Sequence, residues 1–153
     1  MKTVKLDEKD LRILKDLERD GKKSLKDVSD SMKLSMTSVF ERIKKLEKGK
    51  VIRGYKAVLD REKLDKGSTA LLLAKVSMQE DLREVAKRVS AASGVSEVFI
   101  VNGKWSLVAK LRGKDAGEIA GIVLDNIRQV KGIEGVEVFH VWETVKESGD
   151  ILN

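Results

Sequence analysis

Residues 24–48 carry two helical patterns with only a few residues between them, and this arrangement constrains the fold more than any other stretch. Ser24 and Ser35 stand where each helix would begin, and a serine hydroxyl there accepts a hydrogen bond from a free backbone N–H. In the first pattern, Val28 and Met32 lie four residues apart on one apolar face. The second pattern has an apolar stripe at spacings of four and three: Val39, Ile43 and Leu46. The stretch therefore predicts a short helix, a tight turn and a second helix.

The outer face of the second helix carries small hydroxyl side chains first and lysines later. At about 100° per residue, the positions opposite the apolar stripe belong to Thr37, Glu41, Lys44 and Lys48. Such a helix fits the major groove of DNA, where small side chains approach base edges and lysines reach phosphates. The predicted DNA-binding residues are Ser35, Thr37, Ser38, Glu41, Lys44, Lys45 and Lys48. A helical hairpin with a solvated basic face is the alternative.

The distribution of charge along the chain supports DNA binding over a plain helical hairpin. The net charge is +6. Residues 1–66 hold 20 Lys and Arg against 13 Asp and Glu, a net charge of +7, whereas residues 67–153 hold 11 against 12, a net charge of −1. A basic N-terminal part fits a module that faces phosphates, and a nearly neutral C-terminal part fits a different task.

Composition excludes several classes of protein. The chain has no cysteine, so it has neither a disulfide framework nor a thiolate site, and a reducing cytoplasm is the simplest location. No apolar run has the length of a membrane span, and the N-terminus lacks the apolar core of a signal peptide. The high proportion of charged residues, 37%, is typical of thermophilic proteins, whereas the absence of proline is not.

A further helix is predicted before the first pattern, and a strand after the second. Asp7 is placed to cap a helix whose apolar positions are Leu11, Ile13, Leu14 and Leu17, and Gly21 ends it. Residues 1–50 therefore predict a three-helix helix-turn-helix domain. Residues 50–60 are extended and partly alternating without a nearby hairpin mate, which predicts a linker strand and makes a second chain a candidate for its partner. The linker and hinge extend over residues 51–67.

Residues 68–153 predict a second domain with the order strand, helix, strand, strand, helix, strand. The expected elements are strands at 68–76, 95–101, 105–111 and 136–145 and helices at 81–93 and 114–130. Asn102-Gly103 predicts a tight turn between the middle strands. Two βαβ units joined by a hairpin make a ferredoxin-like βαββαβ sandwich, so the fold class is α+β. Helices would cover only one face of its sheet, and the other face favours dimerisation by stacking of sheets.

Together these segments resemble the Lrp/AsnC family of transcription regulators. The resemblance rests on three patterns in the N-terminal part: Leu6-Asp7-x-x-Asp10-x-x-Ile13-Leu14, Leu34-Ser35-x-x-x-Val39-x-x-Arg42-Ile43-x-x-Leu46-Glu47 and Gly49-x-Val51-Ile52-x-Gly54-Tyr55. Gly94-Val95, Val101-x-Gly103 and the segment from Val141 to Val145 resemble its C-terminal regulatory (RAM-type) domain. The match covers nearly the whole chain, in order and at the spacing of the family.

The resemblance implies double-stranded DNA as a partner, a homodimer that often assembles into tetramers or octamers, and a linker strand paired across the dimer. It also implies an amino-acid effector bound near the turn between the second and third strands of the regulatory domain, where Asn102, Gly103 and Ser106 lie. At this turn the family commonly has Gly-x-x-Asp, and here Ser106 replaces the aspartate. The missing carboxylate puts amino-acid sensing in doubt, and no other cofactor is expected. Met36 replaces the proline that often follows the capping serine, and a helix tolerates this change.

Other conspicuous residues have ordinary interpretations. Arg42 lies beside the apolar stripe, so an ion pair within the three-helix unit is favoured over base reading. Glu41 would accept from a cytosine amino group or orient a neighbouring lysine. His140 is the only histidine and has no neighbouring ligands, so it predicts no metal site. Trp105 and Trp142 favour packing at a subunit contact over stacking on a ligand.

The leading hypothesis is a sequence-specific transcription regulator that is not an enzyme. One alternative is an architectural protein that wraps DNA with little specificity. A second is enzymatic, because siroheme decarboxylases look similar to this family, although the C-terminal half is poor in titratable groups that catalyse reactions. The operator, the regulated genes, the direction of control and the size of the oligomer are not encoded in any recognisable pattern.

Overall fold

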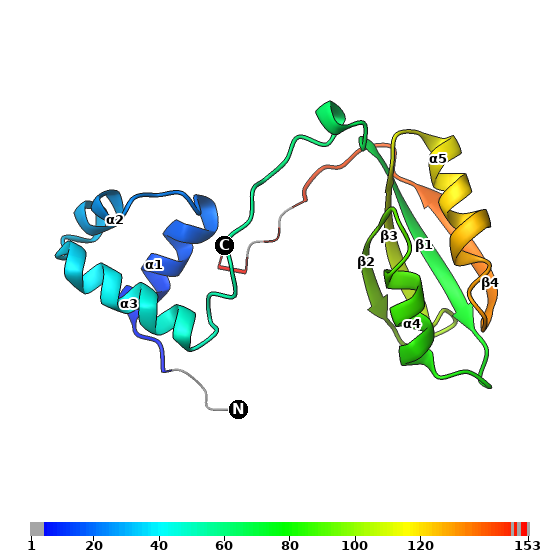
Figure 1. Cartoon of the computed structure of the whole chain (residues 1–153), viewed down its shortest axis with the longest axis horizontal. Helices are drawn as coiled ribbons and strands as arrows, with labels where there is room; N and C mark the ends of the chain where they lie inside the picture. The colour runs from blue at the N-terminus through cyan, green and yellow to red at the C-terminus, as the bar shows by residue number, and fades with distance from the viewer. Residues whose placement is uncertain (1–4, 148, 150, 153) are drawn as a thin grey trace. The chain divides into compact units, whose positions relative to one another are not determined.

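The computed structural model describes residues 5–147, 149, 151 and 152. It divides into two compact units (Figure 1). The first, called the DNA-binding unit below, contains the residues up to Leu59 together with the tail from Lys146 onward. The second, Asp60–Val145, is called the sheet unit. The contacts of the tail thus group it with the N-terminal helices, although it follows directly on the C-terminal domain in sequence.

Three helices form the DNA-binding unit, as the sequence predicted. They are α1 (Glu8–Arg19), α2 (Leu25–Met32) and α3 (Met36–Lys48). Each predicted cap is present: Asp7 accepts from the N–H of Asp10, and Ser24 and Ser35 accept from the N–H groups three residues later. Four fully buried side chains, one or two from each helix, join the three apolar stripes into one core: Ile13, Val28, Val39 and Leu46.

The linker that follows α3 forms no strand within the described part of the single chain. Val51 and Ile52 pack on the edge of the helical core, and the chain then runs without regular structure to the short 3₁₀ helix η1 (Glu62–Leu64). Val58 is 97% exposed. Among the described residues of one copy, no strand pairs with this segment, and its pairing with a second copy remains a prediction.

The sheet unit is a ferredoxin-like α+β sandwich, as predicted. Its four antiparallel strands lie in the order β2-β3-β1-β4. Its elements are β1 (Ser68–Val76), α4 (Leu82–Ser90), β2 (Val95–Ile100), β3 (Leu107–Gly113), α5 (Ala116–Gly121), the π-helix η2 (Ile122–Ile127) and β4 (Ile133–His140).

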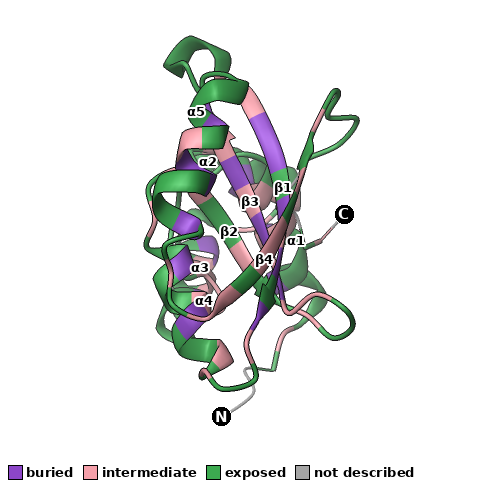
Figure 2. Ribbon diagram, turned by 90° about the vertical axis from the view of Figure 1, so that its right-hand side faces the viewer, coloured by how far each residue is buried: buried purple, intermediate pink, exposed green. Residues whose placement is uncertain are grey.

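The two faces of the sheet differ in burial because alternate residues of a strand point to opposite sides. Leu72 pairs with Ala109 on one side and Val138 on the other, and all three pack in the core beneath the helices (Figure 2). The next residue, Leu71, pairs with Phe139 on the opposite, uncovered face. The sequence therefore predicted correctly that α4 and the α5–η2 segment cover one face only.

Several predicted boundaries in the sheet unit are wrong, and three of the differences change the local structure. The second helix, expected from 114 to 130, begins at Ala116 and changes at Ile122 to a π-helix that ends at Ile127, and both of these isoleucines are buried. The turn at 102–103 is a longer loop, since the N–H of Val101 donates to the carbonyl of Ser106 at 3.0 Å. The last strand ends at His140, since its pairing with β1 ends there.

Candidate nucleic-acid interface

The exposed side of α3 carries the residues that the sequence predicted for DNA binding. Thr37, Glu41, Lys44 and Lys48 are all exposed, and Ser38 is half-buried beside them. Because the stripe from Val39 to Leu46 is buried, this side of the helix is the one left for a partner. Its first turn presents hydroxyl groups, and its last turns present ammonium groups.

Two of the predicted residues already have partners inside the protein. The Ser35 hydroxyl accepts from the N–H of Ser38 at 3.2 Å, so it caps α3. Lys45 donates to the carboxylate of Asp10 at 3.1 Å, although its side chain is half exposed. No sequence pattern indicates the pair of Lys45 and Asp10, because the two residues are 35 positions apart.

Arg42 is an internal ion-pair residue, as the sequence favoured. Its Nη1 atom donates to Asp7 at 2.7 Å and to Asp10 at 2.6 Å. Asp7 and Asp10 also form a reciprocal capping box at the start of α1. This cluster, the Asp10 cluster (Asp7, Asp10, Arg42 and Lys45), joins the N-terminus of α1 to the middle of α3. It therefore sets how the exposed side of α3 is presented.

The electrostatics of the Asp10 cluster follow from these contacts. Burial alone would raise the pKa of Asp10, but hydrogen bonds from Arg42, from the backbone N–H of Asp7 and from Lys45 outweigh burial and lower it. The backbone N–H of Asp10 and the guanidinium of Arg42 lower the pKa of Asp7. The two carboxylates in turn raise the pKa of Arg42. All three groups are ionised at neutral pH.

Lys44 has a neighbour on the exposed side of the helix. Its Nζ atom lies 4.6 Å from the centre of the Phe40 ring, one turn earlier. A cation above an aromatic ring is weakly attracted to it, and this contact orients the lysine without neutralising it. Lys44 therefore keeps a positive charge on the outer side of α3.

The predicted effector residues lie in and beside the loop between β2 and β3. Asn102 and Gly103 are exposed, and Lys104 stacks over Trp105 at 5.3 Å. The hydroxyl of Ser106 accepts from the N–H of Val76 at 3.3 Å, at the end of β1. The structure thus brings the loop and the end of β1 together, and it gives Ser106 a role in the sheet.

Neither a metal site nor a membrane span is found in the described part of the chain. No three His, Cys, Asp or Glu side chains of the described residues form a group that could hold a metal ion. Among the same residues, no helix combines the length and the apolar character needed to cross a bilayer.

Comparison with known proteins assigns both units. Residues 6–47 match the AsnC-type helix-turn-helix domain, and residues 69–151 match the Lrp/AsnC ligand binding domain. The chain is 35% identical to the HTH-type transcriptional regulator FL11 of Pyrococcus abyssi, with 97% of each chain covered. It is 31% identical to the leucine-responsive regulatory protein of Haemophilus influenzae, over 96% of this chain and 90% of that protein.

A solved structure agrees with both assignments. The transcriptional regulator NMB0573 of Neisseria meningitidis, crystallised as a complex with L-Met, superimposes with a TM-score of 0.89 at 25% identity, over 95% of each chain. These matches set aside the enzymatic alternative, because they assign the whole described fold to regulators that bind DNA. The chain belongs to the Lrp/AsnC family: it is a helix-turn-helix transcription regulator with a C-terminal ligand-binding domain.

Proposed function

We propose that this regulator reads a specific DNA sequence with the exposed side of α3. The observation that carries the proposal is the contrast along that side, with Thr37 and Ser38 in the first turn and Lys44 and Lys48 beyond. Small hydroxyl groups suit base edges in the major groove, and ammonium groups suit phosphates. Glu41, exposed between them, would accept from a cytosine amino group. Ser35, which caps α3, would also meet the DNA backbone at the N-terminus of that helix.

Lys45 has a divided role in this proposal. Its pair with Asp10 holds its ammonium group near α1, while half of the side chain remains exposed. The main phosphate contacts are therefore assigned to Lys44 and Lys48, and Lys45 adds positive charge beside them. Arg42 takes no part in base reading, because its guanidinium donates to the carboxylates of Asp7 and Asp10.

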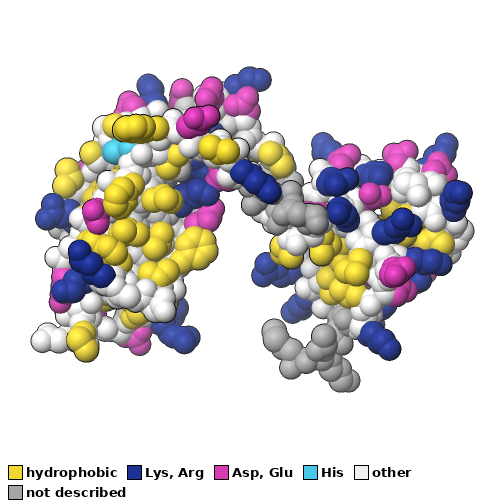
Figure 3. Space-filling view, turned by 180° about the vertical axis from the view of Figure 1, so that it is seen from behind, with side chains coloured by type: hydrophobic (Ala, Val, Ile, Leu, Met, Phe, Trp, Pro, Cys, Tyr) yellow, Lys and Arg dark blue, Asp and Glu magenta, His cyan; other side chains and the backbone are white. Residues whose placement is uncertain are grey.

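The proposal includes a homodimer formed through the uncovered face of the sheet. This face carries large exposed apolar side chains from three strands, Leu71, Phe99 and Phe139, and Figure 3 shows hydrophobic side chains gathered on the sheet unit. Apolar area of this kind is removed from water when two sheets stack. The linker, which forms no strand within the described part of one copy, would supply a second contact between copies. Two copies of α3 would then read half-sites about 34 Å apart or at multiples of that distance. Assembly to tetramers or octamers would build on this dimer.

For the ligand-binding domain we propose an amino-acid effector as the first class to test. The family model describes a ligand-binding domain, and the Neisseria relative was crystallised with L-Met. Asn102 and Gly103 are the residues of this chain proposed to lie nearest the effector. Ser106 offers a hydroxyl where a carboxylate is common, so an ammonium group would be held there by a weaker, uncharged acceptor.

The experiment is selection of genomic DNA by the purified protein, at one fixed salt concentration, with and without pooled amino acids. A palindromic motif whose recovery changes with one amino acid supports both parts of the proposal. A motif that no amino acid changes supports sequence reading and contradicts the effector class. Equal recovery of unrelated sequences contradicts sequence reading and favours the architectural alternative. Because its proposed target is chromosomal DNA, we place the protein in the cytoplasm.

A further inference from the structure

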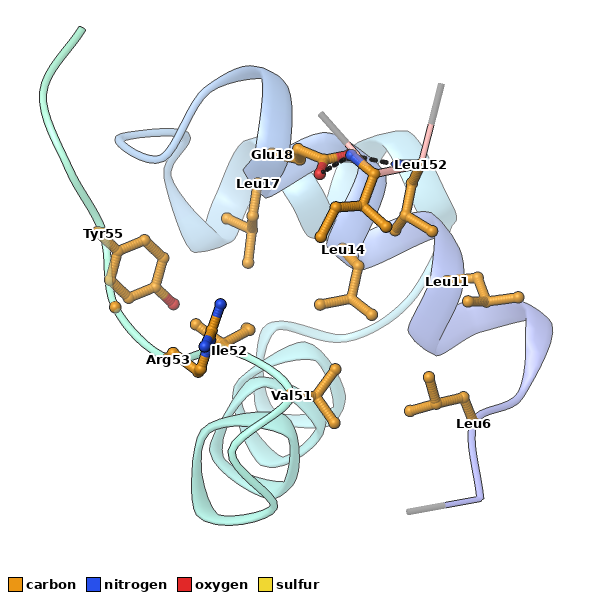
Figure 4. A pocket seen from close by; sticks show the side chains of 12 residues that line it. Leu6, Leu11, Leu14, Leu17, Glu18, Val51, Ile52, Arg53, Tyr55 and Leu152 are labelled. Atoms are coloured by element: carbon orange, nitrogen blue, oxygen red, sulfur yellow. Dashed lines mark hydrogen bonds between the residues drawn. The ribbon is translucent and has the colours of Figure 1, made fainter. Parts of the chain in front are cut away.

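The last described residues of the chain are hydrogen-bonded to the first helix of the DNA-binding unit (Figure 4). The backbone nitrogen of Ile151 lies 2.6 Å from Oε1 of Glu18, and that of Leu152 lies 2.9 Å from Oε2. One carboxylate thus accepts hydrogen bonds from two consecutive backbone N–H groups. Hydrogen bonds to an ionised acceptor are stronger than neutral ones, and two of them fix the direction of the tail.

The tail also borders an apolar groove of about 410 Å³ in the same unit. The groove is lined by α1 and by the start of the linker, chiefly through Leu11, Leu14, Leu17, Val51, Ile52 and Tyr55. Ile151 and Leu152 both line the groove, but Leu152 is half-buried there, whereas Ile151 remains 85% exposed. The attachment therefore combines backbone hydrogen bonds from two residues with burial that falls mainly on Leu152.

We infer that Glu18, Ile151 and Leu152 form a C-terminal clasp that fastens the end of the chain to the DNA-binding unit. The chain leaves this unit after Leu59 and re-enters it at Lys146, so a closed clasp gives the unit two connections to the sheet unit instead of one. The tail also passes the linker, since a Cβ added at Gly149 would lie 3.9 Å from the Lys56 ammonium.

The clasp would act on DNA affinity, and this part of the inference rests on the dimeric regulator proposed above. Once one half-site is bound, the second binds at an effective concentration that depends on how freely the second DNA-binding unit moves. A unit held by two connections explores less space than one held by a single flexible linker. The closed clasp therefore strengthens binding to paired half-sites and leaves binding to one half-site unchanged.

The first test measures the clasp without DNA, by amide hydrogen exchange of the full chain followed by NMR. In the unmodified protein, the amides of Ile151 and Leu152 should exchange about tenfold more slowly than in the Glu18→Ala variant, because an amide held in a hydrogen bond exchanges only when it opens. Ile151→Ala is the matched control: it keeps the N–H and removes only an exposed side chain, so Leu152 should stay protected. Equal rates with and without Glu18 would overturn the inference.

The second test compares DNA carrying two half-sites with DNA carrying one. Leu152→Pro removes the backbone N–H that donates to Glu18. This variant and Glu18→Ala should each weaken binding to paired half-sites about threefold or more. The double variant should bind no more weakly than either single variant. Binding to one half-site should not change. Equal weakening on both DNAs would show that the helical unit itself is damaged and would overturn the coupling. The protein could also bind neither DNA while the amides of Ile151 and Leu152 still exchange slowly. That result would contradict the proposed function and not the clasp.

Discussion

Asp10 is a charged side chain with no exposed surface, and its three partners explain how it is tolerated. Arg42, Lys45 and the backbone N–H of Asp7 together donate to both of its oxygens. A buried charge is costly unless it is paired and hydrogen-bonded. The same contacts hold α1 and α3 together, so this residue links the stability of the unit to the presentation of α3.

Replacing Asp10 should therefore cost more stability than replacing a surface carboxylate. Asp10→Asn leaves Arg42 and Lys45 without their shared charge and should lower the free energy of unfolding by about 3 kcal/mol. Urea denaturation measures this change. Glu84→Gln, in an exposed pair with Lys87, is the control and should change it by less than about 0.5 kcal/mol. Equal losses in the two variants would argue against a structural Asp10 cluster.

The lowered pKa values of Asp7 and Asp10 predict a direction for the effect of pH. Since the folded protein holds these carboxyls below their unfolded value of about 3.9, their stabilisation is complete above that value and is lost as the pH falls through the lower folded values. The urea midpoint should thus stay level down to about pH 5 and fall below about pH 4. In Asp10→Asn the fall should be smaller. An equally steep fall in that variant would show that other carboxyls cause it.

Lys44 tests whether the exposed side of α3 meets DNA. Lys44→Ala should weaken binding to all sequences and reduce the slope of log affinity against log salt by about one unit, because one fewer counterion is released. Affinity titrations at four salt concentrations measure that slope. Lys63→Ala, which removes a lysine from η1, is the control and should leave it unchanged. An unaltered slope for Lys44→Ala would remove this residue from the interface.

At the scale of the elements, Gly94 and η2 depend on each other. Gly94 precedes β2 with φ +82°, and a Cβ there would lie 2.3 Å from Cδ1 of Ile122 and 3.1 Å from the carbonyl oxygen of Arg112. Glycine is needed both for the backbone conformation and for the close approach of η2. The π-helix, in turn, keeps Ile122 buried against this glycine.

Two glycine substitutions should separate these requirements. Gly94→Ala should lose about 3 kcal/mol of stability, because it combines backbone strain with a clash. Gly103→Ala, at φ +116° with no atom within 4 Å, should lose about 1 kcal/mol, from backbone strain alone. Thermal or urea unfolding of the two variants side by side measures the difference. Equal losses would mean that Ile122 can shift without cost.

At the scale of the whole molecule, the uncovered face of the sheet should determine assembly. Phe139→Asp places a charge at the proposed contact between sheets, so desolvation should oppose dimerisation and raise the dissociation constant about 100-fold or more. Sedimentation velocity over a range of concentrations measures the dimer–monomer equilibrium. Met78→Asp, at a fully exposed residue in the β1–α4 loop, should have no effect. An unchanged dimer in Phe139→Asp would place the interface elsewhere.

The sequence by itself determined the local features of this protein. The caps at Asp7, Ser24 and Ser35, the apolar stripes and the strand Ser68–Val76 were all predicted correctly. Each depends on residues within one or two turns of each other, where spacing and hydrogen-bonding capacity are sufficient evidence. The order of elements then left few ways to bury the stripes, so the helix-turn-helix and the ferredoxin-like sandwich followed.

Only the tertiary structure decided which distant residues meet. Lys45 pairs with Asp10 across 35 positions, and Leu152 reaches Glu18 across 134. No periodic pattern marks such contacts, because each is one charge or one N–H placed by the packing of whole elements. For the same reason the π-helix, the longer β2–β3 loop and the early end of β4 were missed. They involve the close approach of Ile122 to Gly94, the hydrogen bond from Val101 to Ser106 and the end of pairing with β1, all of which arise when the sheet assembles.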